Sequence, residues 1–162
     1  MSGAYDSRAD SLAHIHQVRD NIDVFVAEML RRGRVHDASK FSDVEKTRLD
    51  EVLPLLQGVA YGSPAWEEVI NRAAPALAHH FRHNSHHPEH HGNAGIAGMD
   101  LFDVVEMVCD WMAAARRNPA DGVKVAYNVA KFGIEPQMAA IIENTLARWP
   151  ERDAVVGQGA SG

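Results

Sequence analysis

Residues 100–117 have the sequence DLFDVVEMVCDWMAAARR, in which apolar side chains recur at helical spacing. Asp103, Glu106 and Asp110 are separated by three and four residues, so a helix places them on one face. The helix is otherwise apolar and begins after Asp100 as its N-cap, which predicts that most of it is buried. Buried carboxylates need a metal, a cation or hydrogen-bond donors. A metal ligand is the interpretation that best fits Asp110, whereas Asp103 could complement the helix dipole and Glu106 could form a salt bridge.

The same periodicity predicts helices along the rest of the chain and no strand. Gly33 is expected to end the first helix, and Ser42 with Glu45 is typical of a capping box that begins the second. Ser63 and Pro64 are typical of the start of the third helix, and residues 84–98 are expected to form an ordered loop. We therefore predict an all-α, single-domain helical bundle over residues 1–150 and a flexible tail over 151–162. The six expected helices cover approximately residues 7–32, 42–57, 63–83, 100–117, 120–132 and 135–150.

Composition narrows the function classes. The chain has 162 residues, 46% of them hydrophobic, and a net charge of −6. An acidic balance is atypical of proteins that bind a nucleic-acid duplex. No apolar run reaches the roughly 18–20 residues that span a membrane, and the N-terminus lacks the features of a secretory signal. The single cysteine, Cys109, excludes an internal disulfide and favours a reducing, cytoplasmic setting.

Histidine is the residue type that stands out. Seven of the ten histidines fall between residues 79 and 91, in the sequence HHFRHNSHHPEHH. Neutral imidazole is a common ligand of transition metals, so this segment is predicted to bind a metal; the alternative is a solvated surface patch. The four candidate ligands are His79, His80, His86 and His87, and the solvated role is assigned to His83, His90 and His91.

Three further positions could join such a site. His36 and Asp37 are adjacent, and both could bind one metal at a helix end, although an Asp in that place can also serve as a helix cap. Lys40 follows closely and could bind phosphate as a point charge, or could be an ordinary surface lysine. His14 falls on the apolar stripe of the first predicted helix, where a histidine is either a core residue or a ligand.

The combination of His14, His36-Asp37, the histidines of 79–87 and Asp110 resembles the HD-domain superfamily of metal-dependent phosphohydrolases. This resemblance implies an HD-type bundle with a first metal held by His14 or His36 together with Asp37 and Asp110. It implies that His79 or His80, with His86 or His87, completes this site or builds a second one bridged by Asp37. Residues 36–40, HDASK, look like the His-Asp-x-Gly-Lys motif of the cyclic-dinucleotide phosphodiesterase branch, with Ser39 in place of Gly; that branch's Gly-Tyr-Pro signature is absent.

A second resemblance covers residues 11–148. It is to a family of small uncharacterised phage and bacterial proteins, and it brings no established activity. It is carried by His14-Ile15, Arg32-Gly33, His36-Asp37-x-Ser39-Lys40, Tyr61-Gly62-Ser63, His79-His80, Asn84, His86-His87-Pro88-Glu89-His90, Gly98-Met99 and Glu106-Met107-x-Cys109-Asp110-Trp111.

The expected function is that of a metal-dependent phosphohydrolase acting on a nucleotide or another small phosphoester through a metal-activated water. The cofactor is expected to be one or two divalent ions of Fe, Mn, Zn, Co or Ni, with Mg as a further option. Lys40 and Arg82 would hold the phosphate, and Glu106 or Glu89 would act as a general base or orient a ligand histidine. No duplex or membrane partner is expected, and a homodimer would be consistent with HD proteins of this size.

Two other functions fit the same residues. The HD architecture also includes di-iron oxygenases with a similar His/Asp set. A non-catalytic, metal-stabilised binding module would instead hold its ion with no open coordination position.

Overall fold

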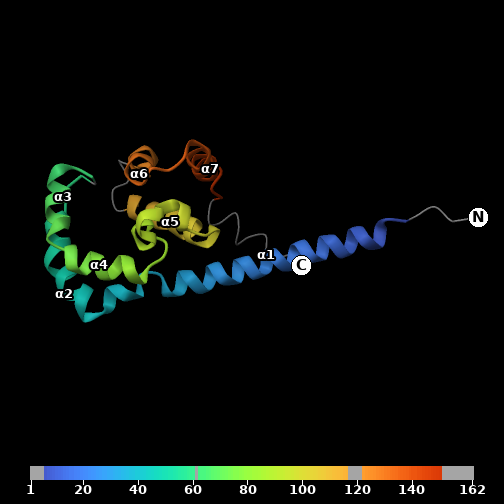
Figure 1. Ribbon diagram of the computed structural model, residues 1–162, viewed down its shortest axis with the longest axis horizontal. Helices are drawn as coiled ribbons and strands as arrows, with labels where there is room; N and C mark the ends of the chain where they lie inside the picture. The colour runs from blue at the N-terminus through green and yellow to red at the C-terminus, as the bar shows by residue number, and fades with distance from the viewer. Residues whose placement is uncertain (1–5, 61, 117–121, 151–162) are drawn as a thin grey trace, which may run out of the picture.

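The computed structural model describes residues 6–60, 62–116 and 122–150, and these are helical, with short connections and no strand (Figure 1). The all-α prediction is therefore confirmed, but the helices are more numerous than the six expected. The α-helices are α1 (Arg8–Val35), α2 (Asp43–Val52), α3 (Pro64–Asn71), α4 (Ala74–His83), α5 (Leu101–Ala115), α6 (Val125–Phe132) and α7 (Pro136–Ala147). Three 3₁₀ segments accompany them: η1 (Ala38–Phe41), η2 (Leu53–Leu56) and η3 (Pro88–Gly98).

The expected and observed helix boundaries differ for identifiable reasons. Gly33 does not end α1, which continues to Val35 before the chain turns at Asp37 with a positive φ of 55°. The single helix expected over residues 63–83 is two helices. Pro75 cannot donate a hydrogen bond and its ring would collide with the Asn71 carbonyl, so α3 ends at Asn71 and α4 begins afresh. The expected loop at 84–98 contains η3, interrupted by two glycines with positive φ.

Helix caps account for the other boundaries. Ser63 accepts a hydrogen bond from the Trp66 amide, as the sequence predicts, and Asp100 forms a capping box with Asp103. The capping box expected of Ser42 and Glu45 is wrong, because the Ser42 side chain forms no cap hydrogen bond. The expected boundaries near residues 117–121 and the tail at 151–162 lie outside the described residues.

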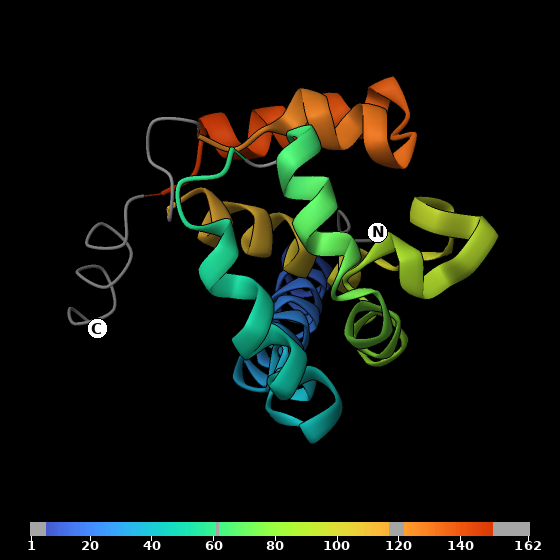
Figure 2. The same cartoon turned by 90° about the vertical axis from the view of Figure 1, so that its left-hand side faces the viewer.

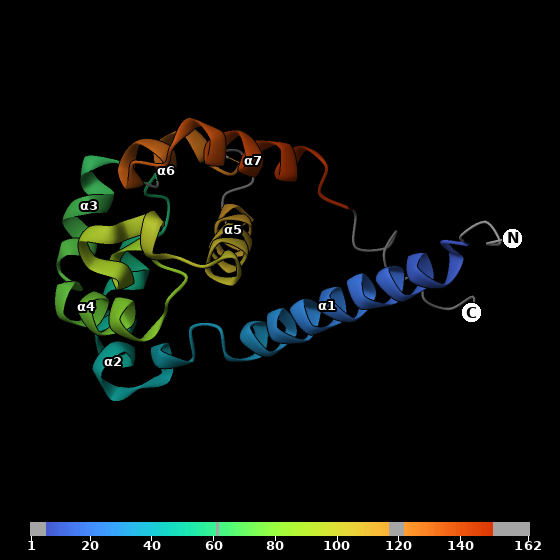
Figure 3. The ribbon, with the colours of Figure 1, turned by 45° about the vertical axis from the view of Figure 1, so that its right-hand side comes forward.

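The main hydrophobic core surrounds α5. Val104, Met107 and Val108 of α5 are buried against Ile134, which follows α6, and Ile142 of α7. Figure 3 shows α5 between α1 on one side and α6 and α7 on the other. The helices α2 and α4 pack together at the end of the body that faces the viewer in Figure 2.

The helix α1 belongs only partly to this body. Its C-terminal half packs against α5, where the rings of Phe25 and Phe102 stack with centroids 4.7 Å apart. Its N-terminal half extends away from the other helices (Figures 1 and 3), and every described residue before Phe25 is exposed. Among the described residues, no helix combines the length and the apolar character that crossing a membrane requires.

Candidate metal centre

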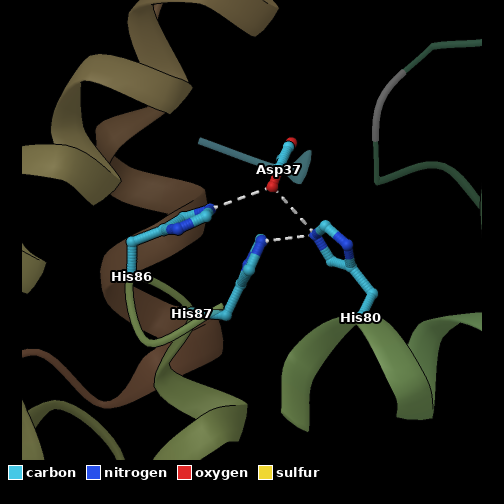
Figure 4. Close-up of side chains that lie close together, drawn as sticks. All are labelled: Asp37, His80, His86 and His87. Carbon is cyan, nitrogen blue, oxygen red and sulfur yellow. Dashed lines mark hydrogen bonds and ion pairs between the residues drawn. The ribbon is translucent and has the colours of Figure 1, made fainter. Parts of the chain in front are cut away.

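Four side chains from three segments converge beside the end of α1. Asp37 follows α1, His80 lies on α4, and His86 and His87 lie between α4 and η3 (Figure 4). Asp37 Oδ1 is 3.2 Å from His80 Nε2 and 3.5 Å from His86 Nε2, and His80 Nε2 is 3.0 Å from His87 Nε2. One ligand atom from each of the four residues lies within 4.8 Å of the others.

A second group shares Asp37. The other carboxylate oxygen, Asp37 Oδ2, is 3.4 Å from His36 Nε2, which in turn is 3.7 Å from Asp110 Oδ1 of α5. His36, Asp37 and Asp110 also offer ligand atoms that lie within 4.8 Å of one another. Asp37 therefore turns one oxygen to each of two adjacent groups, the arrangement expected of a bridging carboxylate.

The spacing of these atoms fits a metal ion. With metal–ligand bonds of about 2.1 Å, ligand atoms lie about 3.0 Å apart in an octahedron and about 3.4 Å apart in a tetrahedron. Asp37 Oδ1 is 3.2 and 3.5 Å from the Nε2 atoms of His80 and His86, and the Nε2 atoms of His80 and His87 are 3.0 Å apart. Asp37 Oδ1 and His86 Nε2 are both buried and lack a hydrogen-bond partner among the described residues. Buried polar atoms without a partner are costly, and a cation placed between them would remove that cost.

The backbone at Asp37 helps to aim its side chain. Asp37 is the one non-glycine residue with positive φ among the described residues. Asp and Asn tolerate this left-handed conformation better than most residues because of their short polar side chains. The turn directs successive residues, His36 and Asp37, into the same cluster, which a continuing helix would send about 100° apart.

Two buried carboxylates orient the histidines. Glu45 on α2, only 1% exposed, accepts hydrogen bonds from His80 Nδ1 at 2.9 Å and His79 Nδ1 at 2.7 Å. Glu106 on α5 lies 2.8 Å from His36 Nδ1 and 3.3 Å from His86 Nδ1. A proton on Nδ1 leaves Nε2 with the lone pair that a metal requires. Carboxylate–histidine pairs of this kind fix the tautomer and the ring orientation around metals.

Glu106 is itself held in place by charge. Arg32 of α1 donates from Nε to Glu106 at 2.7 Å and also forms an ion pair with Asp103. Ser85 donates to Asp103 as well. The carboxylates that the sequence places on one face of α5 therefore divide between two tasks: Asp103 and Glu106 bind Arg32, and Asp110 faces His36.

The shifted pKa values favour the protonation states in which most of these side chains can bind a metal. Burial lowers the pKa of His87 to about 3, and the nearby His86 and His80 reinforce this shift, so His87 is neutral near pH 7. Burial also lowers the pKa of His86. Burial would raise the pKa of Asp37, but the adjacent His80 and the ion pair with Lys40 outweigh burial and hold the pKa well below its usual range. His36 differs: the neighbouring carboxylate of Asp110 raises its pKa to about 9, although burial opposes the shift.

Metal affinity is therefore expected to rise with pH between about 6 and 9, by up to about tenfold per pH unit, because an ion must displace the His36 proton. Calorimetric titrations in two buffers of different ionisation enthalpy would measure the released proton. For the metal-free chain the pH dependence of the stability of the fold has the opposite sign. The raised pKa of His36 stabilises the fold fully below pH 6.5, and that contribution is lost as the pH rises through 9. An affinity that is independent of pH would exclude His36 as a ligand.

Glu45→Gln is expected to weaken metal binding about 10- to 100-fold, because the amide no longer offers carboxylate oxygens to both histidines that Glu45 holds. Equilibrium dialysis followed by elemental analysis would measure the affinity. Glu51→Gln is the matched control: it makes the same change on the same helix, but Glu51 is exposed and, among the described residues, pairs with Arg48 alone. Equal affinities in the two variants would contradict an orienting role for Glu45.

The structure brings six predicted ligands together and leaves two apart. His36, Asp37, His80, His86, His87 and Asp110 belong to the two groups. His14 is exposed on the projecting half of α1, outside every such group among the described residues, and His79 turns to Glu45 instead.

Of the four predicted catalytic residues, two contact the cluster and two do not. Lys40 forms an ion pair with Asp37, and Glu106 contacts His36. Arg82 is exposed on α4, and Glu89 faces Lys131 at 3.9 Å; neither contacts the cluster. Two residues that hold the site, Glu45 and Arg32, were not predicted to have a role in it. Glu45 was missed because it lies three residues after Ser42, a spacing that is typical of a helix capping box.

The fold and this cluster define an all-helical protein with a buried group of histidines and carboxylates that could hold a metal ion. The chain belongs to the family described as "Family of unknown function (DUF5662)", whose model matches residues 3–148. No curated protein and no solved structure matches the chain.

Proposed function

We propose that this protein is a metal-dependent phosphohydrolase of the HD type that acts on a nucleotide or another small phosphoester. The observation that supports this most is the position of Asp37, with one carboxylate oxygen toward His80 and His86 and the other toward His36. A bridging carboxylate between two ligand groups suits a pair of ions, and paired ions suit the displacement of one oxygen at phosphorus by another.

The two halves of the site differ in exposure, which suggests where a substrate enters. The side chains of His80 and His86 are 7% and 2% exposed, whereas His36 and Asp110 are each 29% exposed. His36 and Asp110 also line a groove of about 420 Å³ between α1 and α5. The buried half would hold its ion through protein ligands, and the open half would leave positions for water and a phosphate oxygen.

Bound ions would lower the pKa of a coordinated water and offset the negative charge of the phosphoryl oxygens. In the proposed reaction, the water oxygen bonds to phosphorus while the ester P–O bond breaks, and the leaving oxygen takes up a proton. Asp110, a half-buried carboxylate in the open half of the site, would accept the proton of the attacking water. Lys40, now paired with Asp37, lies close enough to turn its ammonium group to the phosphate once an ion neutralises Asp37.

The test is a hydrolysis screen with the purified chain, metal-depleted and then loaded separately with Mn, Co, Fe, Zn or Mg. Nucleoside mono-, di- and triphosphates and phosphodiesters form the substrate panel, and released phosphate or nucleoside is measured. Activity restored by an ion, and lost when His36→Gln is loaded in the same way, would support the proposal. A chain that binds its ions fully but hydrolyses none of these esters would contradict it.

The number of histidines favours a second candidate, a di-iron oxygenase. Three imidazoles beside one carboxylate suit iron as well as they suit Mn, Zn or Co. Iron content in the purified protein and an electron paramagnetic resonance signal of a mixed-valent iron pair would support this candidate. Hydrolysis with redox-inert Zn or Mg would instead support the phosphohydrolase.

A further inference from the structure

The projecting half of α1 carries an apolar stripe that no other part of the described chain covers. Leu12, Ile15, Val18 and Ile22 recur at intervals of three and four residues, so they share one face. Their exposed fractions lie between 42% and 57%. A continuous apolar face of this length is atypical of a monomer surface and indicates a binding surface. We call residues 8–24 the free half of α1.

The stripe continues into the other half of the same helix, where it lines a groove. Val26, Met29, Leu30 and Gly33 follow Ile22 at the same spacing and form one wall. The opposite wall comes from α5 and includes Val105, Cys109 and Ala113, and the groove ends at His36 and Asp110. The apolar part of the groove, beside residues 25–33 of α1, is about 14 Å long, and the free half is about 25 Å long. A helix such as the free half is therefore long enough to fill this apolar part, and the end of the groove at His36 and Asp110 stays open to the proposed substrate.

We propose that two copies of this chain associate through α1, with the free half of each helix lying antiparallel in the groove of the other copy. Both surfaces lie on one face of one helix, so a single two-fold axis across α1 satisfies both at once, as an isologous interface requires. Hydrophobic anchors of this kind, spaced along a helix and seated in a groove, are a recurrent mode of helix recognition.

The charges of α1 favour a second copy in the antiparallel direction. The free half has a net charge of −1, and residues 25–35 have a net charge of +1 when Arg32, which is paired with Glu106 and Asp103 of its own chain, is left out of the count. An antiparallel pair places the acidic half of each helix beside the basic half of the other. A parallel pair would place halves of like charge together, which is unfavourable.

The test compares substitutions on opposite faces of the free half by sedimentation equilibrium over a wide range of protein concentrations. Ile15→Glu and Ile22→Glu are expected to weaken association at least about 100-fold, because the two-fold axis buries each new carboxylate twice. Val24→Glu is the matched control, since Val24 is 69% exposed and lies on the opposite face of the same helix. It is expected to associate as the unaltered chain does. Since these side chains are exposed in the single chain, helix content and metal content should stay unchanged.

A monomeric unaltered chain, or a Val24→Glu variant that dissociates as readily as Ile22→Glu, would overturn the proposal. The direction is tested separately by Ser11→Cys in a Cys109→Ser background. Antiparallel helices keep the two new thiols at opposite ends of the interface, so oxidation should give no covalent dimer. Rapid formation of that disulfide would show parallel helices and reject the arrangement. None of these outcomes depends on the proposed reaction.

Discussion

Asp37→Asn is expected to lose both the binding of the proposed metal and the proposed hydrolytic activity. The substitution keeps the shape of the side chain and its tolerance for positive φ, but removes the charge that both ligand groups share. Because loss of a group that only orients a ligand costs 10–100-fold in affinity, loss of the bridging carboxylate should cost at least about 100-fold. Elemental analysis after dialysis would measure the metal, and phosphate release would measure the activity.

Asp50→Asn is the control for this experiment, because Asp50 is exposed and its one ion pair within the described part of the chain is with Lys46. It should retain full metal content and activity. Asp37→Ala would add backbone strain at the left-handed turn, so a comparison of the Asn and Ala variants separates loss of charge from loss of fold. Full metal content in Asp37→Asn would remove Asp37 from the ligand set and refute the two-ion arrangement.

Removing the metal with a chelator is expected to lower the thermal midpoint by about 5–10 °C. When the free concentration of an ion is 100 times its Kd for the folded chain, binding stabilises the fold by about 2.7 kcal/mol. Each kcal/mol shifts the thermal midpoint of a domain of this size by about 2–4 °C. The physical reason lies in the buried cluster, where partnerless atoms such as Asp37 Oδ1 and His86 Nε2 destabilise the metal-free chain. Calorimetric melting with and without added ion would measure the shift.

Asp37→Asn serves as the comparison here as well, because an added ion should then change its melting temperature little. If chelation left the melting temperature of the unaltered chain unchanged, the histidine cluster would be a purely protein-stabilised network. The Asp37 and Glu45 predictions would then fail with it.

Sequence periodicity was enough to predict an all-helical chain, because apolar spacing and cap residues are local signals. The histidine run also indicated the chemistry of the cluster without a structure. The histidine run did not predict which of two adjacent histidines faces the cluster. His79 and His80 point about 100° apart on α4, and only the rotation of α4 against Asp37 selects His80.

The missed features depend on contacts between distant segments. Glu45 meets His79 and His80 across 34 and 35 residues, and no local pattern reports such a contact. His14 illustrates the opposite error. Its apolar stripe suggested burial in the core or a place at the metal, but the fold leaves that part of α1 in solvent.

A protein with one cysteine has no covalent means of tying its own distant segments together. Ions shared by Asp37, His80 and Asp110 would act as cross-links between these segments. They would close one loop of about 40 residues, from Asp37 to His80, and another of about 30 residues, from His80 to Asp110. Like a disulfide, a tie of that kind restricts the unfolded chain more than the folded one. Unlike a disulfide, it could be made and broken in a reducing compartment by the supply of ions alone.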